Sequence, residues 1–340
     1  MPVMSAMNDV KLEVLPRDLS PYRSGNVGID YVHRFDSGVA GPHVVVNALT
    51  HGNEFCGMTA VTDLLDRAVR PKRGVLTLCF SNVAAYESFD PARPFESRQI
   101  VHNFNRIWSD QQIDGHERSP ELDRARQLRP VFARADHLLD LHSTSQDVVP
   151  FWVYQGLARH GSLALSLRDP FVHLVMPRGL GSGAPIIQYG RFGDADAQAT
   201  ALVAECGQHF LRKTSELAKS VTAEWLVRVG VLDAADREPA AAVAAVAQKP
   251  MQAQAQAPPQ TATVAEPHRR FELLATLMVK TKNFKFTGSY QGFESFVRGA
   301  IIATDGDETI TAPCDDCTIL MPTRAPIVGR EAVYLARPLS

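Results

Sequence analysis

His51 and Glu54 stand three residues apart, directly after the apolar run VVVNAL. An imidazole nitrogen and a carboxylate oxygen are common zinc ligands, and a turn could direct both at one ion. A helix that begins at this point would also favour an acidic residue in its first turn, so the pair alone fits either interpretation. A second histidine, His142, ends the apolar run HLLDLH, and Asp140 precedes it by two residues.

Together, two histidines and one glutamate would form a catalytic rather than a structural zinc site. Three protein ligands leave the fourth position for water, and zinc lowers the pKa of such a water to about 7. Asp140 could orient the imidazole of His142 through its second ring nitrogen, although a polar residue at the end of a strand would give the same pattern.

The elements that must position these residues alternate between strands and helices. Short runs that are apolar on both faces predict buried strands at 43–49, 74–80, 136–142, 150–155, 171–176 and 200–205. Apolar residues at helical spacing predict helices at 53–70, 119–135 and 208–229. This alternation indicates an α/β fold with helices on both faces of a mostly parallel sheet. Sites in such sheets form at the carboxyl ends of strands, where His51 and His142 both lie.

The composition changes after residue 233. Residues 234–267 are rich in Ala, Gln and Pro, which predicts a flexible linker, with an Ala-rich helix at 239–247 as the alternative. Short strand-like runs follow, separated by Gly, Asp, Asn and Pro, and they predict a small β domain. The expected organisation is therefore a catalytic domain at 1–233, the linker at 234–267 and the β domain at 268–340.

The overall charge and composition narrow the class of protein. A net charge of −2 gives no electrostatic reason to expect nucleic acid or an anionic membrane as partner. No apolar run approaches the length that spans a bilayer, and the first residues show no secretory signal. Five cysteines are an odd, sparse set that fits a reducing compartment. We expect a cytoplasmic protein that acts on a small molecule, with homo-oligomerisation left open.

A further stretch, SRQIVHNFNRIW, places Arg98, Asn105 and Arg106 in an apolar frame. Surface arginines on a solvated loop would give this pattern too. A guanidinium fork beside an amide could instead clamp a carboxylate.

Five short motifs, in their order along the chain, resemble the succinylglutamate desuccinylase/aspartoacylase family, a branch of the zinc carboxypeptidase fold. They are His51-Gly-Asn-Glu54, Arg98, Asn105-Arg106, Asp140-Leu-His142 and Glu205-Cys-Gly207. Residues 316–336 are similar to the end of aspartoacylase's C-terminal β domain. The resemblance implies a carboxypeptidase-like α/β/α sandwich with a mixed, mostly parallel sheet, and a small β domain that narrows the entrance.

The resemblance also implies the catalytic roles. His51, Glu54 and His142 would bind one zinc ion per chain. Glu205 would act as general base towards the attacking water and then protonate the leaving amine. Arg98 would polarise the scissile carbonyl and hold the developing oxyanion. These residue types supply what amide hydrolysis needs.

For the substrate, the resemblance implies that Asn105 and Arg106 hold the carboxylate of the amino-acid part and that Tyr334 contacts the substrate. Two positions depart from the family. Asn103 stands where the family often has an aspartate that could position an arginine. Ala195 stands where aspartoacylase has an arginine for the side-chain carboxylate of its substrate, so the resemblance does not extend to N-acetylaspartate.

Arg191 and Arg178 are the nearby candidates to replace that arginine. The expected activity is zinc-dependent hydrolysis of the amide bond of a small N-acyl amino acid. A metallocarboxypeptidase would use the same site with a wider cleft, and a non-catalytic protein could use the clamp to bind a carboxylate ligand. The presence of Glu205 and a complete ligand set favours an enzyme.

Overall fold

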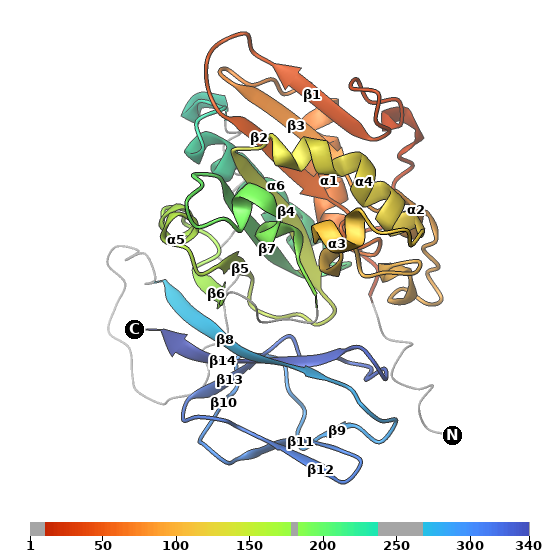
Figure 1. Cartoon of the computed structure of the whole chain (residues 1–340), viewed down its shortest axis with the longest axis vertical. Coiled ribbons are helices and arrows are strands. Elements are labelled where there is room, and N and C mark those ends of the chain that lie inside the picture. Colours follow the sequence, from red (N-terminus) through yellow and green to blue (C-terminus); the bar gives the residue numbers. More distant parts are fainter. Residues whose placement is uncertain (1–10, 178–182, 237–267, 340) are drawn as a thin grey trace.

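The structure is a computed structural model that describes residues 11–177, 183–236 and 268–339. Its main feature is an 11-stranded mixed sheet in the order β1-β3-β2-β4-β7-β5-β6-β8-β14-β13-β10 (Figure 1). The strands are β1 Val32–Asp36, β2 His43–Ala48, β3 Val75–Phe80, β4 His137–Thr144, β5 Phe151–Gln155, β6 Val172–Met176, β7 Thr200–Gln208, β8 Arg269–Met278, β10 Ser295–Phe296, β13 Cys317–Leu320 and β14 Glu331–Leu339.

This sheet contains two groups of parallel strands that are joined by an antiparallel pair, and the strands at both edges pair antiparallel. β3, β2, β4 and β7 run parallel to one another, as do β5, β6 and β8. The two groups meet at the antiparallel pair β7–β5, and β1 and the C-terminal strands also pair antiparallel. The predicted α/β class with a mixed sheet is confirmed, and five of the ten neighbouring pairs in this sheet are parallel.

Helices cover both faces of the sheet. The described helices are α1 Phe55–Asp66, α2 Val83–Glu87, α3 Asp110–Ile113, α4 Pro120–Ala133, α5 Ala158–Ala164 and α6 Arg212–Arg228, with 3-10 turns η1 Ser20–Tyr22, η2 Glu96–Arg98, η3 Phe104–Arg106, η4 Ile186–Gln188, η5 Gly190–Phe192 and η6 Ala234–Asp236.

Successive side chains of β2 pack into two hydrophobic cores on opposite faces of the sheet. Val44 and Val46 pack into the core beneath α1 and α6, whereas Val45 packs into the core beneath α4. Because successive side chains of a strand point to opposite faces, an apolar run without polar interruption is the pattern of a strand covered on both sides. That pattern is why the central strands were predictable.

Three strands differ from the prediction, and the short helices α2, α3 and α5 were not predicted. β1 was not predicted because only Val32 of this edge strand is buried, whereas Arg34 and Asp36 are exposed. β7 continues to Gln208 with every residue buried, so α6 begins at Arg212 rather than at 208. β8 pairs with β6 and thereby continues the main sheet into the C-terminal part of the chain.

The C-terminal part adds a second, three-stranded sheet in the order β12-β11-β9, made of Glu308–Thr311, Ile301–Asp305 and Lys285–Phe286. It has its own apolar core around Ile302, Ile319 and Val333. The domain boundaries remain a prediction. Of the predicted linker, 237–267 lies outside the described residues, as does its helical alternative at 239–247.

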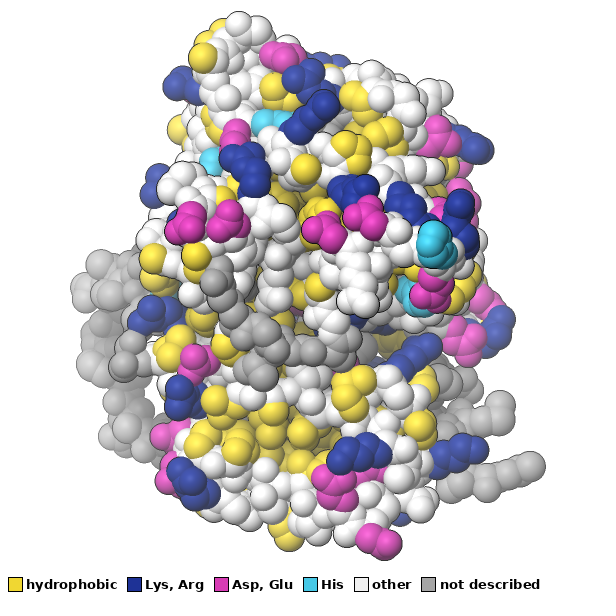
Figure 2. Space-filling model, viewed as in Figure 1, with side chains coloured by type: hydrophobic (Ala, Val, Ile, Leu, Met, Phe, Trp, Pro, Cys, Tyr) yellow, Lys and Arg dark blue, Asp and Glu magenta, His cyan; other side chains and the backbone are white. Residues whose placement is uncertain are grey.

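The viewed surface mixes Lys and Arg with Asp and Glu over its upper part, and hydrophobic side chains gather over the lower part, where the C-terminal strands lie (Figure 2). None of the helices in the described part of the chain combines the length and the apolar character needed to cross a bilayer.

Candidate active site

His51, Glu54 and His142 form a buried cluster at the carboxyl ends of β2 and β4. The Glu54 carboxylate lies between the two imidazoles, with Oε1 2.8 Å from His51 Nδ1 and Oε2 2.9 Å from His142 Nδ1. One ligand atom from each residue falls within 4.8 Å of the other two. Two imidazoles and a carboxylate with this convergence suit a zinc ion, so the donor set fits the predicted metal.

The turn after β2 distinguishes the two interpretations of Glu54, as a metal ligand or as an acidic residue that starts a helix. Gly52 is required there, because a Cβ atom would lie 2.3 Å from the backbone of Ala85 and 2.4 Å from the Ser97 carbonyl oxygen. Glu54 stands at the N-cap position of α1, yet its side chain makes no capping hydrogen bond. The carboxylate is directed at the histidines instead.

The second ring nitrogen of His142 is held by Asp140, which is one of the two interpretations that the sequence left open for this aspartate. His142 Nε2 lies 2.7 Å from Asp140 Oδ2. The other oxygen, Oδ1, accepts hydrogen bonds from the Asn47 amide at 2.8 Å and the Thr50 hydroxyl at 2.7 Å. This fixed carboxylate sets the ring orientation and leaves Nδ1 as the atom that faces Glu54.

Asn103 does the same for His51. Its Oδ1 atom lies 3.0 Å from His51 Nε2 and also accepts the backbone N–H of Asn105 at 3.0 Å. The sequence had suggested that this position helps to place an arginine. In the structure it contacts a candidate metal ligand, and an amide oxygen meets that need without a charge.

The charges in the cluster shift the pKa values of its three residues in different directions. Burial lowers the pKa of His142, but the carboxylates of Asp140 and Glu54 outweigh burial and raise it well above 6.5. Burial raises the pKa of Glu54, but the two imidazoles hold it well below 4.5. Burial and the Arg98 guanidinium lower the pKa of His51 to about 4. A divalent ion would satisfy the same carboxylates.

Glu205 lies on β7 directly beside His142 of β4, since the two residues are register partners in the parallel pair. Glu205 is only 7% exposed, and its Oε2 atom has no hydrogen-bond partner among the described residues. Burial is the main reason that its pKa rises to about 8, and the nearby carboxylate of Glu54 adds to the effect. This side chain can therefore exchange a proton close to neutral pH.

Arg98 reaches the cluster from η2, where its Nη1 donates to Glu54 Oε1 at 3.1 Å. The loop that follows is fixed by the buried Glu121 in the first turn of α4. The Glu121 carboxylate accepts backbone N–H groups from each residue of Ile100–His102 at 2.7–3.3 Å. A buried acid thus anchors the segment that carries the predicted clamp.

Arg106 and Tyr334 meet around a residue that the sequence did not single out, Glu331. Arg106 Nη2 donates to Glu331 Oε1 at 2.6 Å and to the Tyr334 hydroxyl oxygen at 3.0 Å, while the Tyr334 hydroxyl donates to Glu331 Oε2 at 2.8 Å. Burial raises the pKa of Glu331, but the charges of Arg106 and Arg98 outweigh it and lower the pKa to about 2.

Two features explain why the sequence did not indicate a role for Glu331. Its partner Arg106 lies 225 positions earlier in the chain. A register shift in the β14–β8 pair falls between Glu331 and Val333, and such a bulge redirects side chains on a strand. Two residues three apart on β14, Glu331 and Tyr334, can then face the same arginine.

This triad gives a stability prediction. Replacement of Glu331 by Gln is expected to lower the free energy of unfolding by about 1–3 kcal/mol, because a mostly buried guanidinium loses its charged acceptor. Urea unfolding followed by circular dichroism measures the difference. Glu308→Gln is the matched control, since its ion pair with Lys280 is exposed, and a Glu331 effect no larger than this control would contradict the prediction.

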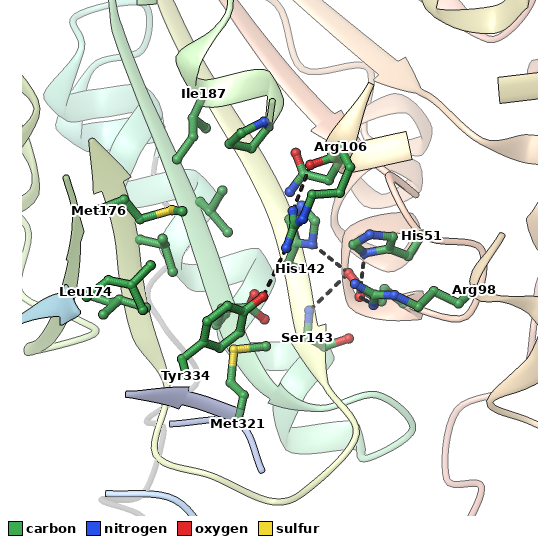
Figure 3. A pocket seen from close by; sticks show the side chains of 17 residues that line it. His51, Arg98, Arg106, His142, Ser143, Leu174, Met176, Ile187, Met321 and Tyr334 are labelled. Carbon is green, nitrogen blue, oxygen red and sulfur yellow. Dashed lines mark hydrogen bonds and ion pairs between the residues drawn. The ribbon is translucent and has the colours of Figure 1, made fainter. Parts of the chain in front are cut away.

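All eight predicted site residues line one pocket (Figure 3). They are His51, Glu54, Arg98, Asn105, Arg106, His142, Glu205 and Tyr334. Neither of the two candidate substitutes for the family's additional arginine is among the described lining residues of this pocket. Arg191 is held away by the Ala135 carbonyl oxygen at 3.3 Å and Asp136 at 3.1 Å, and Arg178 lies outside the described residues.

Comparison with known proteins points to one family. Residues 40–170 match the family model of the succinylglutamate desuccinylase/aspartoacylase catalytic domain, a range that holds every candidate metal ligand. A succinylglutamate desuccinylase of Vibrio vulnificus is 24% identical over 308 residues, which cover 86% of this chain and 80% of the relative. Residues 40–170 are therefore similar to the catalytic domain of the succinylglutamate desuccinylase/aspartoacylase family, and the resemblance indicated by the motifs is confirmed.

Solved structures show the same fold. The succinylglutamate desuccinylase from Chromobacterium violaceum matches with a TM-score of 0.61 and 19% identity, covering 92% of this chain and 89% of that chain. The enzyme from Vibrio cholerae matches with a TM-score of 0.59 and 20% identity, covering 91% and 86%.

Proposed function

We propose that this protein is a zinc-dependent amidohydrolase that cleaves the amide bond of a small N-acyl amino acid. The observation that carries the proposal is Glu205, a buried carboxyl group with an unpartnered oxygen, in register beside His142 of the three-residue cluster. The similarity of residues 40–170 to this family supports a deacylase.

The metal would be held by His51, Glu54 and His142. When bound, zinc supplies a Lewis acid that makes water nucleophilic at neutral pH and polarises a carbonyl group. Asp140 and Asn103 hold the two imidazoles in the orientation that presents their Nδ1 atoms.

Glu205 then moves the proton. It accepts a proton from the water molecule that attacks the acyl carbon, and it donates that proton to the nitrogen atom as the carbon–nitrogen bond breaks. The products are a carboxylate and a free amino acid. A group with a pKa of about 8 can perform both steps near neutral pH.

Two arginines would hold the substrate's negative charges. Arg98 stands beside Glu54 at the edge of the cluster, where its guanidinium can donate to the oxyanion that develops on the acyl carbonyl. Asn105 and Arg106 would bind the carboxylate of the amino-acid part, with Tyr334 as a further contact. Glu331 would then yield its place on Arg106 to the carboxylate of the substrate.

A hydrolysis screen tests this function. The zinc-loaded protein is expected to release free amino acid from N-acetyl amino acids, detected by amine derivatisation, and chelator-treated protein is the control. Cleavage of peptides without cleavage of N-acyl amino acids would favour a metallocarboxypeptidase. No cleavage of either class, with unaltered ligand binding in Glu205→Gln, would favour a carboxylate-binding protein without catalytic activity.

A further inference from the structure

One side of the pocket is apolar. It consists of side chains from five elements, and we call it the apolar wall: Val153 of β5, Leu174 and Met176 of β6, Ile187 of η4, Val203 of β7 and Leu273 of β8. Figure 3 shows Leu174, Met176 and Ile187 across the pocket from His51, His142 and Arg98.

None of the six residues that form the apolar wall carries a positive charge. Among the described lining residues, the arginines are Arg98 and Arg106, and each already faces a carboxylate. Arg98 donates to Glu54 at 3.1 Å, and Arg106 donates to Glu331 at 2.6 Å. A substrate with one carboxylate can exchange with Glu331 on Arg106. A second carboxylate against the wall would be buried without a cationic partner among the described lining residues, which is strongly unfavourable.

The wall begins directly beside the proposed carboxylate clamp. Asn105 Oδ1 accepts the backbone N–H of Ile186 at 3.0 Å, so the pocket-lining Ile187 is the next residue along the chain from that contact. Gly183 also fixes this loop, because a Cβ atom there would lie 2.5 Å from the Arg106 carbonyl oxygen. An amino acid whose α-carboxylate binds Asn105 and Arg106 would therefore place its side chain along the wall.

We propose that the amino acid released by this enzyme carries an apolar, uncharged side chain of aliphatic or thioether type. The proposal rests on the proposed function for the position of the α-carboxylate. It assigns specificity to the apolar wall, and it excludes dicarboxylic amino acids as preferred products.

Ligand binding tests the proposal separately from catalysis. In zinc-loaded Glu205→Gln protein, calorimetry is expected to show that N-acetyl-L-leucine and N-acetyl-L-methionine bind at least about 100-fold more tightly than N-acetyl-L-aspartate and N-acetyl-L-glutamate. The wild-type protein should show the same order in kcat/KM. Acidic ligands that bind as tightly as apolar ones would overturn the proposal.

A charge placed in the wall gives the matched variant. Met176 is only partly buried, and Met176→Arg is expected to shift the acidic-to-apolar binding ratio towards acidic ligands by at least about tenfold, whereas Met176→Leu keeps the wild-type order. Zinc content and melting temperature verify the fold of both variants. If Met176→Arg fails to fold, the ligand-binding measurements on the Glu205→Gln and Met176→Leu proteins still test the proposal.

Two results separate the possible failures. If no N-acyl amino acid is hydrolysed by the wild type, the proposed function fails, while the order of ligand binding still supports or overturns the wall's specificity. If acidic ligands are preferred and Arg178→Gln abolishes this preference, the specificity comes from that arginine and the proposal on the apolar wall is wrong.

Discussion

Glu205→Gln is expected to lower kcat for amide hydrolysis by about 10²–10⁴-fold, the usual contribution of a general acid–base group. The amide keeps the size of the carboxyl group but cannot accept the proton of the attacking water or return it to the leaving amine. Zinc content and melting temperature should stay at wild-type values, because Glu205 is not one of the three clustered ligands.

Steady-state kinetics on an N-acyl amino acid, with zinc measured in the same samples, provides the test. Glu216→Gln is the control, since Glu216 is an exposed glutamate on α6. A Glu205→Gln protein that retains kcat within about threefold of the control would remove Glu205 from the proton transfer and leave the proposed chemistry without a base.

The second large effect concerns metal affinity. His51→Ala and His142→Ala are each expected to weaken zinc binding by more than about 100-fold, because a direct ligand is lost. Asp140→Asn should weaken it by about 10–100-fold, the range for a partner that orients a ligand. Competition with a chromophoric chelator measures all three affinities.

His137→Ala is the matched control, because it removes an imidazole from the opposite end of the same strand, where it contacts Thr200. Its zinc affinity should equal that of the wild type. If His51→Ala and His142→Ala also bound zinc as the wild type does, the cluster could not be the metal site.

Much of the fold followed from the sequence because its signals are local. An uninterrupted apolar run such as Val44–Val46 of β2 or Ala201–Ala204 of β7 predicts a strand buried on both faces. The edge strand β1 is only partly buried and was not predicted, and β7 extends further than the sequence predicted.

Local signals suggested the candidate metal ligands, whereas the family resemblance implied the roles of the other site residues. His51 and Glu54 follow β2 and His142 lies near the end of β4, so their convergence at one edge of the sheet could be expected. Glu331 could not, because its contact with Arg106 depends on the pairing of β14 with β8 and on the bulge in that pair. The apolar wall likewise joins five elements whose proximity only the assembled sheet defines.

The most direct test is the recovery of hydrolysis when zinc is titrated into chelator-treated protein, with an N-acyl amino acid as substrate. A site formed by His51, Glu54 and His142 predicts a rise in activity that reaches its plateau at one zinc ion per chain. Full activity in the chelator-treated protein, or no activity at any zinc concentration, would contradict the proposal that this cluster and Glu205 form a zinc amidohydrolase.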